Sequence, residues 1–354
     1  MGRLDDLLRR LCAEGGSDLH LSAGQPPRMR RRGSLEPAEG LAPLGDADVR
    51  ALLREVASPE AWAQYEASSD LDFAYGLDDV GRFRVNYFVQ ENGAAAVFRL
   101  IPAVVESVEQ LGLPAAVRSL AHLDRGLVLV TGPTGSGKST TLAAIINEIN
   151  ENYAKHILTI EDPIEFVHVG KRCVFSHREV GTHTAGFGAA LRAALREDAD
   201  VILVGEMRDY ETIALALTAA EMGVLVFGTL HTSGAAKSID RVIDAFPVDE
   251  QPQARLSLSE SLAGVVSQLL LRTADGTGRC TAIEVLFRTS ALGNVIRERN
   301  TPMLQNIIQS GKAQGMQTID DALLDLIEAG RILPGDAYRN AADKARFERF
   351  APAE

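Results

Sequence analysis

The sequence predicts an α/β protein with two domains. Its 354 residues give room for two domains that each bury a core, and the hydrophobic share of 46% is that of a globular chain. From about Leu113 onward, short apolar runs alternate with helical patterns. Runs of this kind are expected of strands buried on both faces of a mainly parallel sheet. They lie at 127–130, 156–160, 201–204 and 225–230.

The region before this alternation predicts an α+β domain at residues 1–101. Leucines recur at helical spacing near the start, and later segments alternate polar and apolar residues as half-buried strands do. Residues 102–114 are expected to form a linker to the second domain. The expected elements are a helix at 4–11, a strand at 17–22, a hairpin at the basic residues 28–32, a helix at about 46–65, a hairpin through 71–75 and 81–87, and a strand at 95–100.

The apolar run 127–130 is followed at once by a glycine-rich stretch with the pattern G-x-x-x-x-G-K-[ST]. This pattern binds phosphate when a strand precedes it and a helix follows it. In that context the backbone N–H groups of the loop and the N-terminus of the helix point at the phosphate. Lys138 is expected to bridge the β- and γ-phosphates of a nucleotide, and the Ser139 hydroxyl to bind Mg²⁺. The stretch consists of Gly132, Pro133, Thr134, Gly135, Ser136, Gly137, Lys138, Ser139 and Thr140.

The alternating pattern with this loop predicts a RecA-like P-loop domain at 115–354. Its last part, from about Gln251 to the end, is expected to be helical. Core positions are expected there at Leu256, Leu258, Leu262, Val265, Val266 and Leu269.

Acidic residues follow two of the predicted strands. Glu161, Asp162 and Glu165 come after the run 156–160, where Pro163 disfavours a helix, and Glu206 follows the run 201–204. Ligands of open α/β sheets sit outside the carboxyl ends of strands. Glu206 is the first candidate for orienting water or binding the Mg²⁺ shell, directly or through water. The other acids are expected to share this catalytic work.

His231 follows a third predicted strand, 225–230, and is a candidate sensor of the γ-phosphate. A single histidine is also a common structural residue, so this role depends on the surrounding pattern.

Composition excludes several classes of protein. The net charge of -12 gives no electrostatic footprint for a nucleic acid. Three widely spaced cysteines suggest neither a zinc cluster nor a disulfide framework, and no apolar run reaches the roughly 18 residues of a membrane span. The sequence therefore predicts a cytoplasmic protein without direct membrane insertion.

Taken together, these motifs resemble the secretion-superfamily ATPases, and among them the retraction ATPases of type IV pili. The resemblance extends from Ser17–Gly24 through Gly81–Asn86 to Gly315–Thr318. His156–Phe166 is similar to the family's Asp box, and Leu203–Asp209 to its Walker B segment, in which Gly before Glu is usual.

The resemblance implies a PAS-like N-terminal domain, a RecA-like motor domain, and a homohexameric ring that uses ATP and Mg²⁺. It also implies docking under an inner-membrane pilus platform protein, so that the chain is peripheral at the membrane through partners. Arginines of the N-terminal domain are expected to complete the nucleotide site, and Arg82, Arg84 and Arg99 match that region. Whether the ring works alone or beside a paralogous retraction ATPase is left open.

Two departures leave alternatives open. Val224 stands where the family's His box begins with His, and Gly293 replaces the first Arg of a motif at Ala291–Glu298 that the family ties to retraction. A regulatory or accessory ring subunit is therefore one alternative, and Asp275–Arg279 is similar to the accessory paralogues. An assembly or type II secretion ATPase is another, although a tetracysteine zinc insertion is missing from this sequence. A nucleic-acid translocase on the same core is disfavoured by the acidic charge balance.

Overall fold

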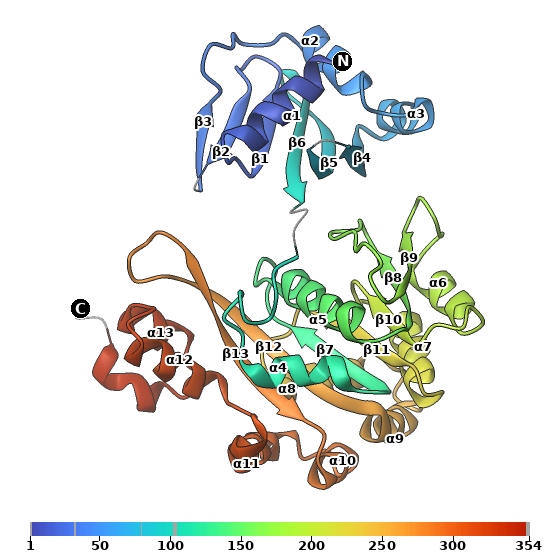
Figure 1. Cartoon of the computed structure of the whole chain (residues 1–354), viewed down its shortest axis with the longest axis vertical. Coiled ribbons are helices and arrows are strands. Elements are labelled where there is room, and N and C mark those ends of the chain that lie inside the picture. The colour runs from blue at the N-terminus through green and yellow to red at the C-terminus, as the bar shows by residue number, and fades with distance from the viewer. Residues whose placement is uncertain (1, 32, 79, 102–104, 352–354) are drawn as a thin grey trace. The chain divides into compact units, whose positions relative to one another are not determined.

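A computed structural model describes residues 2–31, 33–78, 80–101 and 105–351 (Figure 1). The chain divides into two compact units, residues 1–104 with 163–167, and residues 105–162 with 168–354. Of the predicted linker 102–114, residues 102–104 lie outside the described part. Val108 and Leu113, within the remainder, are buried in the core of the second unit. No helix in the described part of the chain has both the length and the apolarity to span a bilayer.

The first unit is an antiparallel sheet with helices packed on its apolar side. The strand order is β3-β2-β1-β6-β5-β4, and the expected pairing of the two hairpins is confirmed. Leucines of the first helix and aromatic side chains such as Phe83 and Phe98 form the core. The elements are α1 (Arg3–Ala13), β1 (Asp18–Ser22), β2 (Arg28–Arg31), β3 (Ser34–Pro37), α2 (Asp46–Arg54), α3 (Pro59–Ser68), β4 (Asp70–Leu77), β5 (Gly81–Gln90) and β6 (Gly93–Ile101).

The single helix expected from Asp46 to Tyr65 is wrong, because two helices occupy this stretch. Helix α2 ends at Arg54, and α3 begins at Pro59. Proline is favoured in the first turn of a helix, where its missing N–H costs nothing, and Ser58 caps the new helix by accepting from the Ala61 amide at 3.1 Å. The Ser58-Pro59 pair is therefore a helix start that the apolar pattern alone did not reveal.

The second unit contains the alternating strands and helices that the sequence predicts. Its sheet has the order β13-β12-β7-β11-β10-β8-β9, in which the neighbours from β12 to β9 are parallel and β13 is antiparallel to β12. The strands are β7 (Gly126–Thr131), β8 (His156–Glu161), β9 (Val174–Glu179), β10 (Val201–Val204), β11 (Leu225–Leu230), β12 (Leu262–Arg272) and β13 (Arg279–Phe287).

Helices cover both faces of this sheet. Alternate strand residues pack into one of two apolar clusters, so that Leu127 and Leu129 face one cluster and Val128 and Val130 the other. One cluster contains α5 (Lys138–Asn152), α4 (Ala115–Arg118) and η1 (Ser119–His122). The other contains α6 (Phe187–Ala194), α7 (Tyr210–Glu221), α8 (Ala235–Asp244), α9 (Gln251–Ser261), α10 (Ser290–Arg297) and α11 (Leu304–Ser310).

The prediction that the chain is helical from about Gln251 onward is wrong for residues 262–287, which contain two strands. Residues 262–272 and 279–287 form the hairpin β12–β13, and β12 pairs directly with the P-loop strand β7. The expected core positions Leu258, Leu262, Val265 and Val266 are buried, whereas Leu256 is 40% exposed and Leu269 is half-buried. Two-sided burial makes a strand continuously apolar, so β12 could not be told from a buried helix by periodicity.

A smaller apolar cluster joins the tip of this hairpin to the last helices. Leu271 and Cys280 pack with α12 (Ile319–Glu328), α13 (Pro334–Asn340) and η4 (Lys344–Phe350), which lie beside β12 and β13 in Figure 1. The helical tail predicted from about Met303 is thus confirmed, with the short turns η2 (Thr301–Met303) and η3 (Lys312–Gln314) between its helices.

Candidate nucleotide-binding site

The P-loop connects β7 to α5 in the conformation that its glycines permit. Gly132, Gly135 and Gly137 have φ values of 144°, 77° and 87°, a region that side chains rarely adopt. A Cβ at Gly132 would lie 2.3 Å from the carbonyl oxygen of Gln268, so this position also needs glycine for space. No side chain caps the N-terminus of α5, and its amides therefore remain available to an anion.

Lys138 is the first residue of α5 and reaches back over the loop. Its Nζ donates to the carbonyl oxygens of Gly132 at 3.0 Å and Pro133 at 3.1 Å, and lies 3.4 Å from His231 Nδ1. Thr134 Oγ1 is also 3.4 Å from the same imidazole nitrogen. The structure thus joins the loop after β7 to the end of β11, as expected for neighbouring parallel strands.

His231 connects this loop to the acid at the end of β10. Its Nε2 lies 2.9 Å from Glu206 Oε1, and Arg208 Nε lies 2.5 Å from the same oxygen. Burial raises the pKa of Glu206, but the hydrogen bonds and charges of Arg208 and His231 outweigh burial and lower it below the ordinary value. The hydrogen bond to Glu206 in turn raises the pKa of Arg208. Glu206 is therefore held as a carboxylate.

A side chain at Gly205, which precedes Glu206, would be crowded by the neighbouring strand. A Cβ would lie 3.2 Å from the carbonyl oxygen of Ile160 and 3.3 Å from Cα of Glu161, at the end of the neighbouring β8. The carbonyl oxygen of Gly205 accepts a 2.5 Å hydrogen bond from Thr229 Oγ1. Close packing of the three strand ends therefore favours glycine at this position.

The other predicted acids are placed differently from one another. Glu161 ends β8 and is buried, and Asp162 is exposed and close enough to contribute to the raised pKa of Arg208. Glu165 is half-buried and lies in 163–167, a segment that belongs to the first unit.

The three predicted arginines share one face of the sheet in the first unit. Arg84 is directly opposite Arg99 on the neighbouring strand, and Arg82 lies two residues before Arg84. Arg99 donates to Asp18 at 2.8 Å, and Arg84 lies 4.0 Å from Asp72. Arg84 and Arg99 therefore each face an acid on the same sheet.

Sequence reasoning missed the residues that support the site from β12. Gln268 Nε2 donates to the carbonyl oxygen of Ser136 at 2.6 Å, which fixes the middle of the P-loop. Gln268 is 1% exposed and 132 residues away from Ser136 in sequence. No local motif marks it, and only the pairing of β12 with β7 brings it to the loop.

Among the described residues, no group of three or more His, Cys, Asp or Glu side chains is arranged to bind a metal ion. Mg²⁺ at a nucleotide keeps several waters and uses few protein ligands besides phosphate oxygens. The Ser139 hydroxyl in the first turn of α5 and the Glu206 carboxylate are of the right chemistry for such a site.

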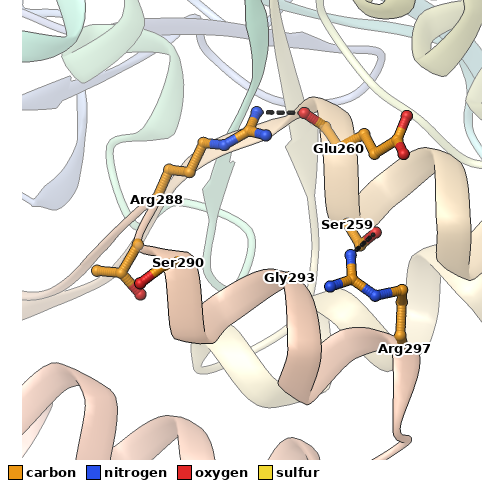
Figure 2. A pocket seen from close by; sticks show the side chains of 7 residues that line it. Ser259, Glu260, Arg288, Ser290, Gly293 and Arg297 are labelled. Atoms are coloured by element: carbon orange, nitrogen blue, oxygen red, sulfur yellow. Dashed lines mark hydrogen bonds between the residues drawn. The ribbon is translucent and has the colours of Figure 1, made fainter.

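The two departures noted in the sequence lie away from these groups. Val224 precedes β11 and His231 follows it, so the two residues are roughly 23 Å apart at about 3.3 Å per residue. Gly293 lies in α10, at an open hollow of about 340 Å³ between α9 and α10 (Figure 2). Arg297, one turn further along α10, donates to Ser259 Oγ at 3.0 Å across this hollow (Figure 2).

A parallel sheet with a P-loop after one strand, β7, and a carboxylate after another, β10, two strands away, is the nucleotide-binding core of P-loop NTPases. Comparison with known proteins narrows this class. A family model described as Type II/IV secretion system protein matches residues 67–330. The chain belongs to this family.

Similar proteins support the same assignment over nearly the full length. The type IV pilus retraction ATPase PilT of Pseudomonas aeruginosa is 50% identical over 344 residues, covering 97% of this chain and 98% of that protein. A twitching motility protein of Neisseria gonorrhoeae is 55% identical over 277 residues, 78% of this chain and 74% of that protein.

A crystal structure of the pilus retraction motor PilT with bound ADP matches with a TM-score of 0.91 and 43% identity, covering 99% of both chains. The predicted fold class and the predicted family resemblance are therefore confirmed.

Proposed function

We propose that this chain is an ATP-hydrolysing motor that drives the disassembly and retraction of type IV pili. The observation that carries the proposal is His231, which contacts both Lys138 of the P-loop and Glu206, two residues after the end of β10. A group in this position can respond to the γ-phosphate and to the carboxylate at once. The similarity to PilT over nearly the whole chain indicates which process such a motor would drive, the retraction of pili.

Nucleotide binding is assigned to the P-loop, Gly132–Thr140. The amides of the loop and of the first turn of α5 would donate hydrogen bonds to the phosphate oxygens, and Lys138 would exchange its two carbonyl contacts for phosphate oxygens. Ser139 would hold Mg²⁺, which when bound would neutralise charge on the β- and γ-phosphates.

Hydrolysis needs a positioned water more than covalent chemistry from the protein. Glu206, kept ionised by Arg208 and His231, would accept a hydrogen bond from that water and orient it. Glu161 and Asp162, at the adjacent end of β8, are assigned to the same edge, and Glu165 is assigned a supporting role.

Arg82, Arg84 and Arg99 are proposed to complete the site from the first unit of the same or a neighbouring chain. For Arg84 and Arg99 this requires an exchange of partner, because they face Asp72 and Asp18. Such an exchange would couple nucleotide binding to the pairing of charges on the first sheet.

The working assembly is proposed to be a cytoplasmic homohexamer. It would lie at the inner membrane through a pilus platform protein, alone or beside a paralogous retraction ATPase. Its domains are proposed to be 1–101, the connection 102–114, and 115–354.

The test is ATP binding and turnover by two purified variants. Lys138→Ala should lose nucleotide affinity and turnover together, whereas Glu206→Ala should keep affinity for a fluorescent ADP analogue and lower turnover by about 100-fold or more. Full turnover by Glu206→Ala would remove Glu206 from the mechanism. Nucleotide binding by a wild-type hexamer without turnover would favour a regulatory ring subunit instead.

The regulatory alternative rests on Val224 and Gly293. Within one chain, Val224 lies at the opposite end of β11 from His231, and Gly293 lines the hollow between α9 and α10. Neither residue removes a group from the cluster of Lys138, Glu206 and His231. Hydrolysis is therefore the better supported function.

A further inference from the structure

The turn that follows His231 is held in place by side chains from a distant hairpin. The Gly234 amide donates to Ser267 Oγ at 2.7 Å, and the Ala235 amide donates to Glu284 Oε1 at 2.7 Å. Ser267 lies on β12 and Glu284 on β13, directly opposite each other in the ladder. These bonds cap the N-terminus of α8, whose own N-cap residue, Gly234, has no side chain to do so.

Glu284 is an unusual residue for this position in a core. It is 2% exposed, and it accepts hydrogen bonds from two uncharged donors, the Ala235 amide and Gln305 Nε2 at 3.3 Å. Burying a carboxylate is costly, and part of that cost is offset by the positive end of the α8 dipole. What Glu284 supplies at this place is an oxygen acceptor for the Ala235 amide at the start of α8.

The other side of the turn is fastened to the strand that leads into the P-loop. Ser238 Oγ, on the first turn of α8, lies 2.8 Å from Thr232 Oγ1 and donates to Thr131 Oγ1 at 3.2 Å. Thr131 ends β7, one residue before Gly132. Hydrogen bonds therefore connect the turn 232–235 to the P-loop strand β7 on one side and to the hairpin β12–β13 on the other. His231 immediately precedes this turn.

We propose that Glu284 is a positioning residue that fixes the turn 232–235, and through it His231, in the place required for hydrolysis. This inference rests on the proposed ATPase function. Gln305 belongs to α11, so Glu284 also connects His231 to the C-terminal helices. A shift of α11 would change how Glu284 fixes the turn 232–235 without changing the P-loop.

The proposal predicts a specific separation of kinetic effects. Glu284→Ala frees the Ala235 amide and the turn, so kcat should fall by about 10-fold or more, as for loss of an oriented catalytic group. Affinity for ADP should stay within about 3-fold, because the P-loop is supported by Gln268 and not by Glu284. Glu284→Gln keeps an acceptor for the amide and should restore most of kcat.

Asp320 offers a matched control for stability. It is another buried carboxylate, 5% exposed, that accepts two backbone amides, those of Ala342 at 2.8 Å and Asp343 at 2.9 Å. Asp320→Ala should lower thermal stability much as Glu284→Ala does, yet keep kcat. If Glu284→Ala does not fold, Ser267→Ala removes the other bond to the turn and should lower kcat several-fold.

The experiment measures kcat, KM and the affinity for a fluorescent ADP analogue for hexamers of the wild type and these variants. A wild-type kcat in Glu284→Ala or, where that variant does not fold, in Ser267→Ala would overturn the proposal. An equal loss of kcat in Asp320→Ala would also overturn it. A wild-type chain that binds nucleotide without turnover would instead overturn the proposed function, and this inference with it.

Discussion

The two loops that meet at the nucleotide site are built in different ways. The P-loop after β7 is specified by its own residues, since three glycines with positive φ and Lys138 shape it locally. The turn after β11 carries no such motif, and Ser267, Glu284 and Ser238 hold it from other elements. The P-loop is thus shaped mainly by its own residues, with one supporting bond from Gln268 on β12, whereas the position of His231 depends on contacts distant in sequence.

The largest effect is expected from a substitution within the P-loop itself. Gly132→Ala would place a Cβ 2.3 Å from the backbone oxygen of Gln268, which cannot move without distorting β12. We expect affinity for ADP to fall about 100-fold, equivalent to roughly 3 kcal/mol. Fluorescence titration with an ADP analogue measures it.

Gly135→Ala is the matched control for this substitution. Gly135 also has a positive φ, 77°, but a Cβ there would meet nothing within 4 Å. It should cost only the backbone strain of about 1 kcal/mol, or about 5-fold in affinity. Equal losses in the two variants would show that the contact with Gln268 is unimportant.

The sequence predicted the local features well and the long-range ones poorly. Short sequence patterns predicted the P-loop, the acids Glu161 and Glu206 at strand ends, and His231. Parallel strands place their carboxyl ends at one edge of the sheet, so these patterns also predicted that the residues would lie close together. Gln268, Ser267 and Glu284 were missed since they lie on β12 and β13, and residues 262–272 were predicted as helix. Their contribution depends on the pairing of β12 with β7, which no local pattern specifies.

A smaller effect tests whether the P-loop also needs support from a distance. Gln268→Met keeps the volume but removes the 2.6 Å hydrogen bond to the Ser136 carbonyl oxygen. The net loss of about 1 kcal/mol should weaken ADP binding about 5-fold and leave kcat at saturating ATP unchanged. Calorimetric titration with ADP and steady-state turnover together decide this. A fall in kcat with unchanged affinity would contradict the division between the two loops.

The smallest effect concerns pH. Arg208 and His231 lower the pKa of Glu206 against the effect of burial, so removing Arg208 should raise that pKa. Because the carboxylate is the active form, kcat falls as pH drops through this pKa, and in Arg208→Ala the fall should begin at a higher pH than in the wild type. The pH profile of kcat, in a range where circular dichroism shows both proteins folded, measures the shift. If kcat fell over the same acidic pH range in both proteins, Arg208 would not affect the pKa of Glu206.

The most direct test of the proposed motor is pilus retraction in living cells. Labelled pili would be followed by fluorescence microscopy in a bacterium that carries either the wild-type gene or Glu206→Ala as its sole copy, with equal protein levels confirmed. We predict cycles of extension and retraction with the wild type, and extended pili that do not retract with Glu206→Ala. Equal retraction in both strains would contradict the account.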